Sequence, residues 1–121
     1  MSVSVDPEVI ESLKMLASED DPDFLKLLIE TYLEDAQALY QQLVDASQSG
    51  DSNLACRFAH TLKSSSANMG AIPLANYAEL VEESLRTGTD LQALVDPIQK
   101  MGEELKLVVN YLRKELHGTG L

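Results

Sequence analysis

Apolar residues recur at every third or fourth position through about 25 residues of the chain, and this spacing restricts the possible folds more than any other feature. The series consists of Leu25, Leu28, Ile29, Tyr32, Leu33, Ala36, Leu39, Tyr40, Leu43 and Val44. Residues at this spacing fall on one face of an α-helix, whereas a half-buried strand requires a two-residue alternation. No segment of the sequence shows that alternation. The sequence therefore predicts an all-α protein.

Aspartates, prolines and glycines divide the chain into five helical stretches. Aspartate can cap a helix, proline is tolerated in the first turn, and glycine favours the end of a helix. The expected stretches run from Asp6-Pro7 to residues 18–21, from Asp21-Pro22 to Gly50, from Asp51-Ser52 to Gly70, from Pro73 to Thr87-Gly88, and from Thr89-Asp90 to about residue 116.

The last stretch carries an apolar series that is close to a heptad seam: Leu94, Ile98, Met101, Leu105, Val108 and Leu112. Pro97 interrupts this series, because proline lacks a backbone donor and clashes with the preceding helical turn. We expect either a kink at Pro97 or a short turn before a helix that starts near it.

Short connections between long helices make neighbouring helices antiparallel. The sequence thus predicts an up-down four-helix bundle with a short additional N-terminal helix laid across it. We expect a single domain over residues 1–121, with a core over about residues 6–116 and a frayed tail over residues 117–121.

The composition limits the possible partners and the compartment. The chain has 20 acidic and 9 basic residues and a net charge of −11, which argues against nucleic acid or an anionic membrane as the main partner. Cys56 is the only cysteine, so there is no internal disulfide and no cysteine-based zinc site, as in a reducing compartment. The sequence shows no signal peptide and no apolar run of about 20 residues. We expect a cytoplasmic protein and, with five helices filling the core, a monomer.

One window of this acidic chain contains no acid. An even spread would put about four or five acids between Ser52 and Ala78, but the window contains none. It contains instead Arg57, Lys63 and His60, one of two histidines. An electropositive segment of this kind is suited to an anion such as a phosphoryl group.

Helical geometry places His60 away from the apolar side of its helix. At about 100° per residue, a polar and small-residue face surrounds it, made of Asn53, Cys56, Arg57, Lys63, Ser64 and Ala67. The opposite side collects Phe58, Leu62, Ser65 and Met69, with Leu54 and Ala55 on its flanks. His60 is therefore not expected to be a core histidine.

The residues beside His60 suit a nucleophile that accepts a phosphoryl group in water. Arg57 and Lys63 lie one turn before and one turn after it, where each could neutralise a charged oxygen. Ser64 is small and leaves room for a bulky partner. A neutral imidazole is a competent nucleophile near neutral pH. The alternative is an ordinary surface histidine, which is the commonest role of an exposed histidine. Cys56 and His60 without a third ligand are a poor metal site, and small-residue packing is the better interpretation of Cys56.

The segment from residue 59 to residue 71 resembles the signature of histidine-containing phosphotransfer (HPt) domains. In that signature the histidine is followed by x-Leu-Lys-Gly-Ser, then by a small residue, and by a glycine ten positions after the histidine. An apolar anchor follows on the next helix. The matching residues here are His60, Leu62, Lys63, Ser65, Gly70 and, as the anchor, Leu74. The resemblance extends over the whole chain, since these domains are four-helix bundles of this size with an extra N-terminal helix.

The resemblance implies roles for individual residues. His60 would be the phosphoacceptor, modified on its outer ring nitrogen, and Lys63 would offset the phosphate charge. Ser64 stands where the family commonly has glycine, which implies a slightly narrower approach. Gly70 would let the chain leave the helix. Glu82 falls where family members often have Gln or Glu to bind the inner ring nitrogen.

A solvated surface carboxylate beside Glu79 and Glu83 is an equally good interpretation of Glu82.

The resemblance also implies a function. The chain would accept a phosphoryl group on His60 from the phospho-aspartate of a response-regulator receiver domain and pass it to another receiver aspartate. Its partners would be receiver domains and a hybrid sensor histidine kinase. It would need no cofactor of its own, because Mg²⁺ would belong to the receiver. The sequence has no Gly-rich phosphate loop, so we expect a carrier without autonomous kinase activity.

Two other classes of function are alternatives. A non-phosphorylated helical adaptor would bind signalling partners without phosphate chemistry, although the intact spacing of His60, Lys63 and Gly70 speaks against it. A phosphohistidine phosphatase or metal-dependent hydrolase would need a second acid or base near His60, and the acid-free window supplies none on the same helix.

Docking would use exposed apolar residues near His60. The candidates are Leu13, Leu16, Phe24 and Leu28, and ordinary core packing is the alternative for each of them. Met1 and the complete bundle favour a freestanding protein over a fragment of a hybrid kinase.

Overall fold

The structure is a computed structural model, and it describes residues 3–16, 21 and 23–120, without the side chains of residues 118–120. Its elements are α1 (Pro7–Leu16), α2 (Phe24–Ser49), α3 (Ser52–Asn68), α4 (Ile72–Arg86), the 3₁₀ helix η1 (Leu91–Leu94) and α5 (Val95–Gly120). The described residues contain no strand. The prediction of an all-α bundle is confirmed.

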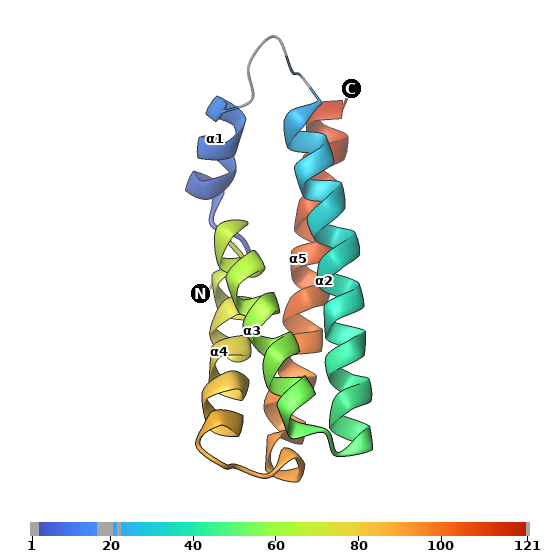
Figure 1. The fold of residues 1–121 in the computed structure, drawn as a ribbon. Coiled ribbons are helices and arrows are strands. Elements are labelled where there is room, and N and C mark those ends of the chain that lie inside the picture. The colour runs from blue at the N-terminus through green and yellow to red at the C-terminus, as the bar shows by residue number, and fades with distance from the viewer. Residues whose placement is uncertain (1–2, 17–20, 22, 121) are drawn as a thin grey trace.

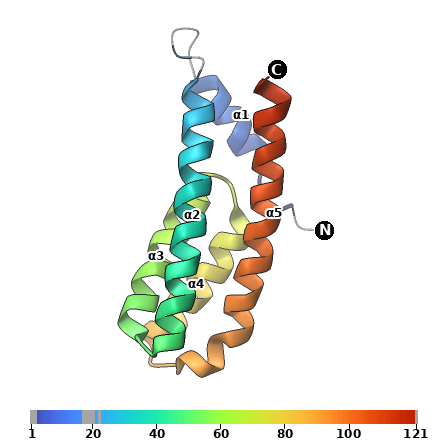
Figure 2. The ribbon, with the colours of Figure 1, turned by 90° about the vertical axis from the view of Figure 1, so that its right-hand side faces the viewer.

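The four long helices form the bundle, and α1 extends it at one end. In Figure 1, α2 and α5 run side by side along the whole molecule, and α3 and α4 accompany their lower parts. α1 lies beyond the upper ends of α3 and α4, and Figure 2 shows it between the upper parts of α2 and α5. Lys14 of α1 lies 3.4 Å from the carboxylate of Glu115 on α5, which ties the added helix to the bundle.

The helix ends lie close to the aspartates, prolines and glycines that predicted them. α2 begins at Phe24, with Asp23 as its cap residue, two residues after the expected Asp21-Pro22; Pro22 lies outside the described residues. Gly50 ends α2 in the left-handed conformation with φ of 78°. The side chain of Asp51 then caps α3 by accepting a hydrogen bond from the backbone N–H of Leu54 at 3.0 Å.

α1 ends at Leu16, and most of its expected end at residues 18–21 lies outside the described residues. Pro97 is the third residue of α5 and follows the turn made by η1, where its missing N–H would have no acceptor within the helix. The second of the two expectations for Pro97 is therefore the observed one. α5 continues to Gly120, into the tail that we expected to be frayed.

The core lies along the bundle axis and includes the whole predicted seam of the last stretch. The buried members of that seam are Leu94, Ile98, Met101, Leu105, Val108 and Leu112. Most of the predicted series of α2 is also buried: Leu25, Ile29, Tyr32, Leu33, Ala36 and Leu43. The remaining members of that series are partly buried and pack against the core.

The buried face of α3 differs from the predicted one. It contains Ala55, Ala59, Leu62, Ser66 and Met69. The prediction placed Phe58 and Ser65 on this side together with Leu62 and Met69. Phe58 and Ser65 are only partly buried. α3 is rotated about its axis relative to the prediction. Its small residues face the neighbouring helices, where they let the helix axes come close.

Ser66 shows how α3 tolerates a polar residue inside the bundle. It is completely buried, and its hydroxyl lies 2.8 Å from that of Tyr32 on α2. Burial of the phenol raises the pKa of Tyr32 to about 12, although the hydrogen bond to Ser66 partly opposes this. The two hydroxyls therefore satisfy each other as neutral groups.

Gly70 follows the end of α3 and contacts the start of α1 in space. It has φ of 84°, and its carbonyl accepts a hydrogen bond from the N–H of Asp6 at 2.8 Å. A Cβ atom on Gly70 would lie 2.9 Å from the Cβ of Val9 on α1. The glycine is thus required both by the backbone conformation and by the close approach of α1.

Gly70→Ala should lower the free energy of unfolding by more than Gly50→Ala, measured by chemical denaturation. Both substitutions place a side chain in the left-handed region, at a cost of about 1–2 kcal/mol. Only Gly70 also meets a neighbour, since nothing lies within 4 Å of a Cβ on Gly50. Adding Val9→Ala should recover part of the extra loss at Gly70 and none at Gly50. Equal losses for the two glycine variants would contradict the close contact.

Candidate functional site

The two side chains at the centre of the site come from neighbouring helices. His60 lies on α3 with 58% of its side chain exposed, and Glu82 lies on α4 with 2% exposed. The ring atom Nδ1 of His60 is 2.6 Å from Oε2 of Glu82. An exposed ring is thus held from behind by a buried carboxylate.

Glu82 is buried because of its place in the apolar series of α4. The buried residues of that helix are Leu74, Ala75, Ala78, Val81, Glu82 and Leu85, which recur at helical spacing. Glu82 therefore occupies a position on the face that α4 turns toward α3, with its carboxylate directed at the polar side of α3. Of the two interpretations that the sequence left open, the solvated surface carboxylate is excluded by this burial.

Two cations share the Glu82 carboxylate with His60. The Nζ atom of Lys63 lies 2.6 Å from Oε1, and Nη2 of Arg86 lies 2.6 Å from Oε2. The other guanidinium branch, Nη1, reaches Oε1 of Glu83 at 2.9 Å. Both oxygens of the buried carboxylate therefore have positively charged partners, which offset the cost of removing its charge from water.

The charge state of Glu82 determines where the imidazole proton lies. Burial alone raises the pKa of Glu82, but the hydrogen bonds and charges of Lys63 and His60 outweigh burial, so that its pKa is lower than usual. Glu82 is thus ionised near neutral pH and can only accept the bond from Nδ1. In the neutral ring Nδ1 carries the proton, and Nε2 keeps a free lone pair.

Two other residues that the sequence placed beside His60 lie at the surface. Arg57 and Ser64 are both exposed. Among the described residues, Arg57 forms no ion pair. At about 100° per residue, Arg57 is displaced from His60 in the direction opposite to Lys63 and Cys56, which contact Glu82 on α4. One predicted cation is therefore bound to Glu82 and the other is free to meet an approaching group.

The surface around the ring is open. A depression of about 500 Å³ is lined by Asn53, Cys56, Arg57, His60, Thr61 and Glu82. Cys56 is half-buried, and its Sγ donates to the backbone carbonyl of Glu82 at 3.7 Å, which agrees with its interpretation as a packing residue. No group of three possible metal ligands occurs among the described residues, and no helix in that part of the chain is long and apolar enough to cross a membrane.

Arg86 is the site residue that sequence reasoning missed. It stands four positions after Glu82, a spacing at which an acid and a base meet on one helix face. This spacing alone did not indicate a functional role for Arg86, because Glu82 could equally have been a surface residue. Its contact with the buried oxygen makes Arg86 part of the site.

Comparisons with known proteins found a matching family model and similar solved structures. The family model described as Hpt domain matches residues 23–115. The chain is similar to the crystal structure of histidine-containing phosphotransfer protein B (HptB) from Pseudomonas aeruginosa PAO1, with 31% identity, a TM-score of 0.83 and coverage of 95% of this chain and 96% of that one. It also shares the fold of the HPT domain from the Hpt sensor hybrid histidine kinase of Shewanella, with 15% identity, a TM-score of 0.79 and 95% coverage of both chains. Comparison with curated protein sequences found no match.

The lowered pKa of Glu82 predicts a pH dependence of stability. A carboxyl whose pKa falls on folding adds stability above its unfolded pKa, which is near 4.5, and this contribution is lost as the pH falls through its folded pKa. The stability of the wild type relative to Glu82→Gln should therefore decline when the pH is lowered from about 6 to about 3. Urea denaturation at a series of pH values measures this difference. Glu83→Gln, which removes an exposed carboxylate from the same helix, is the matched control, and a constant difference for Glu82→Gln would contradict the prediction.

Proposed function

The chain belongs to the histidine-containing phosphotransfer (Hpt) domain family, whose members carry phosphoryl groups in phosphorelays, and on this premise we propose that His60 is the residue that carries the group. The observation that supports this assignment is the 2.6 Å bond between Nδ1 and Glu82 beneath an exposed ring. That bond leaves Nε2 as the nucleophilic atom and directs it toward solvent.

The proposed reaction is an in-line transfer between two proteins. Nε2 of His60 attacks the phosphorus of a receiver-domain phospho-aspartate, the P–N bond forms, and the P–O bond to the aspartate breaks. The reverse sequence of events delivers the group to the aspartate of a second receiver. Lys63 and Arg57 lie one turn to either side of the ring along α3 and would neutralise the oxygens of the phosphoryl group. Ser64, also exposed beside the ring, leaves space for the receiver.

We infer the partners from this reaction. They are response-regulator receiver domains and a hybrid sensor histidine kinase, in keeping with the Shewanella domain, whose description names such a kinase. The Mg²⁺ that the transfer requires would be held by the receiver, and this chain would need no cofactor. We further propose that the protein has no kinase activity of its own, and that it acts as a monomer in the cytoplasm.

Exposed apolar residues at the α1 end of the molecule would support docking. Leu16 and Phe24 are exposed, as are their neighbours Met15 and Leu27. Leu13 and Leu28, which the sequence also suggested, are partly buried and pack against the core. Leu16 and Phe24 are therefore the better candidates for contact with a receiver.

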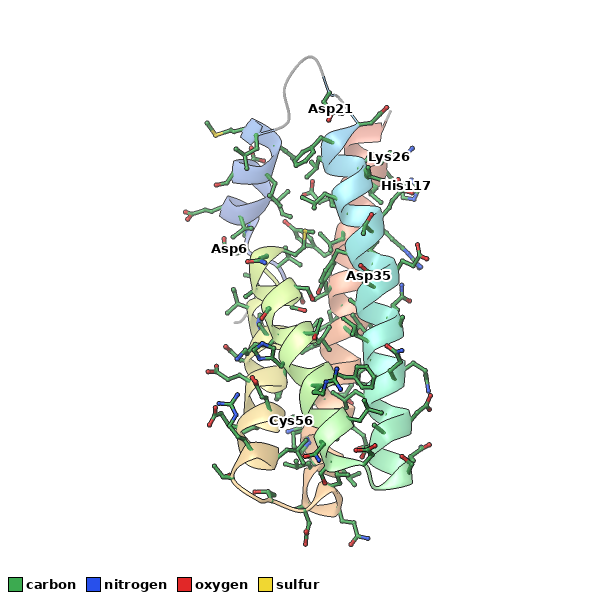
Figure 3. All side chains as sticks on the ribbon, viewed as in Figure 1. Asp6, Asp21, Lys26, Asp35, Cys56 and His117 are labelled. Carbon is green, nitrogen blue, oxygen red and sulfur yellow. The ribbon has the colours of Figure 1, made fainter. Side chains whose placement is uncertain are left out.

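His60→Gln should abolish transfer of label from a phosphorylated receiver domain to this protein. Glutamine cannot form the P–N bond, and the fold should persist because the ring is exposed and Lys63 and Arg86 still pair with Glu82. His117→Gln is the matched control, since His117 is the other histidine and lies near the C-terminal end of α5, far from Cys56 on α3 (Figure 3). Label that persists in His60→Gln would exclude the assignment, whereas binding of receivers without any transfer in the wild type would favour the adaptor.

Lys63→Ala should slow phosphoryl transfer to His60 or shorten the lifetime of the phosphorylated form, by roughly tenfold if one charge-assisted interaction is lost. Helical content, measured by circular dichroism, should not change. Lys100→Ala is the control, because Lys100 is an exposed lysine on α5 that pairs with Asp96. Equal rates and lifetimes in wild type and Lys63→Ala would remove Lys63 from the site.

A further inference from the structure

The depression of about 500 Å³ beside His60 is longer than a phosphoryl group on the ring requires. Its lining residues on α3 run from Asn53 to Thr61. At 1.5 Å per residue, Asn53 lies about 10 Å from His60 along the helix axis. A phosphoryl group on Nε2 would occupy the end of the depression at the ring. The end at Asn53 therefore remains open to a group of the docking partner.

That open end carries hydrogen-bond donors without acceptors. Among the described residues, the guanidinium of Arg57 forms no ion pair, and the side-chain amide of Asn53 forms no hydrogen bond. Both side chains are exposed. Because Asn53 and Arg57 are four residues apart on α3, they are neighbours on one face of the helix. They can therefore donate to the same acceptor.

The acids around this end of the depression already have partners. Glu82 lines the depression, and its carboxylate is held by the ring and by two cations. Asp51, at the start of α3, accepts a hydrogen bond from the backbone N–H of Leu54. Glu83 on α4 is bound by Arg86. The donors at the open end are thus available to an acid from another molecule.

The acid-free window of the sequence also extends further than a phosphoryl group requires. It runs from Ser52 to Ala78 and so covers the whole of α3 and the first half of α4. An acid at Ser52 would lie about 12 Å from His60 along the helix, which is beyond the screening length of about 8 Å at physiological ionic strength. Such an acid would have little effect on the phosphoryl group. It would, however, repel an acidic group that docks at the start of α3.

We propose that Asn53 and Arg57 form a subsite for an acidic side chain of the receiver domain, and that this subsite discriminates between receivers. The inference rests on the proposed function of His60. A guanidinium has five N–H donors, so Arg57 can bind the receiver carboxylate and an oxygen of the phosphoryl group together. The amide of Asn53 supplies a further donor to the carboxylate. A receiver without an acid at this position would cover these donors and leave them unpaired, which lowers its affinity.

The subsite and the apolar docking residues lie toward opposite ends of α3. In Figure 1, α3 begins at the lower end of the molecule and ends beside α1. Leu16 ends α1 and Phe24 begins α2, whereas Asn53 is the second residue of α3. A receiver held both at the apolar end and at the subsite would have a defined orientation over His60, as transfer between two positioned groups requires.

Asn53→Asp tests the subsite without changing its shape. The new carboxylate lies four residues before Arg57, where it can pair with the guanidinium and repel an incoming acid. The helix should form, because an acid is favourable in the first turn. The kcat/KM of transfer from a phosphorylated receiver domain should fall about tenfold or more, through a higher KM for the receiver. Asn110→Asp is the matched control, since it adds the same charge at an exposed asparagine of α5.

A small phosphoryl donor separates docking from the chemistry at the ring. Labelling of His60 by phosphoramidate, which needs no receiver, is compared with labelling by the receiver in each variant, and circular dichroism checks the fold. In Asn53→Asp the rate with the receiver should fall about tenfold more than the rate with phosphoramidate. In Asn110→Asp the two rates should keep the ratio that they have in wild type.

Substitutions in the receiver identify the acidic group itself. The acids on its docking face are replaced by asparagine, one at a time. One of these receivers should transfer less well than the unaltered receiver to wild type. With that receiver, the loss caused by Asn53→Asp should shrink from about tenfold to about twofold or less, since the two carboxylates no longer oppose each other.

The outcomes separate this inference from the function on which it rests. If no receiver domain labels His60, the proposed function fails and the inference fails with it. If receivers label His60 but Asn53→Asp behaves like Asn110→Asp, the inference alone is overturned. Equal losses with phosphoramidate and with the receiver would also overturn it, because the effect would then lie at the ring. A selective loss that no receiver substitution reduces would exclude an acidic side chain as the occupant.

Discussion

The buried carboxylate of Glu82 is the interaction on which the site depends. A carboxylate taken out of water is destabilising by several kcal/mol unless charged or hydrogen-bonding partners replace the solvent. Here the partners come from two helices, with His60 and Lys63 on α3 and Arg86 on α4 itself. The contacts of His60 and Lys63 with Glu82 cross from α3 to α4 at 2.6 Å, so these two contacts constrain the register of α4 against α3. The requirement for partners therefore also sets the orientation of the imidazole.

Close packing of α3 and α4 is what makes these contacts possible. The interior face of α3 carries Ala55, Ala59 and Ser66, and α4 contributes Ala78, all of them completely buried. Small side chains let the two helices approach each other closely. His60 and Lys63 on α3 can therefore contact Glu82 on α4. α2 and α5 lie alongside α3 and α4 and complete the core (Figure 1). The hydroxyl of Tyr32 on α2 forms a hydrogen bond with the buried hydroxyl of Ser66 on α3. The bundle thus acts as a rigid support that presents one exposed ring.

The sequence predicted the parts of this arrangement that depend on helical periodicity and on the residues that begin and end helices. The seam of α5 and the end of α2 at Gly50 follow from helical spacing and from backbone conformation, which are properties of short segments. The buried face of α3 was misplaced because alanine and serine carry little apolar signal, while Phe58 carries a strong one. Glu82 remained ambiguous and Arg86 was missed, because burial of an acid depends on which residues of another helix face it. That information is not contained in the spacing of α4.

The acid-free window of the sequence acquires a more specific meaning from the position of Glu82. The site does contain an acid, but α4 supplies it from behind the ring, where it is buried and bound to two cations. An acid on the exposed face of α3 would instead lie beside Nε2, where it would repel a phosphoryl group and compete for Lys63 and Arg57. The window therefore separates two requirements that oppose each other. Negative charge is needed at Nδ1 to hold a proton, and it must be absent at Nε2 so that an anion can approach.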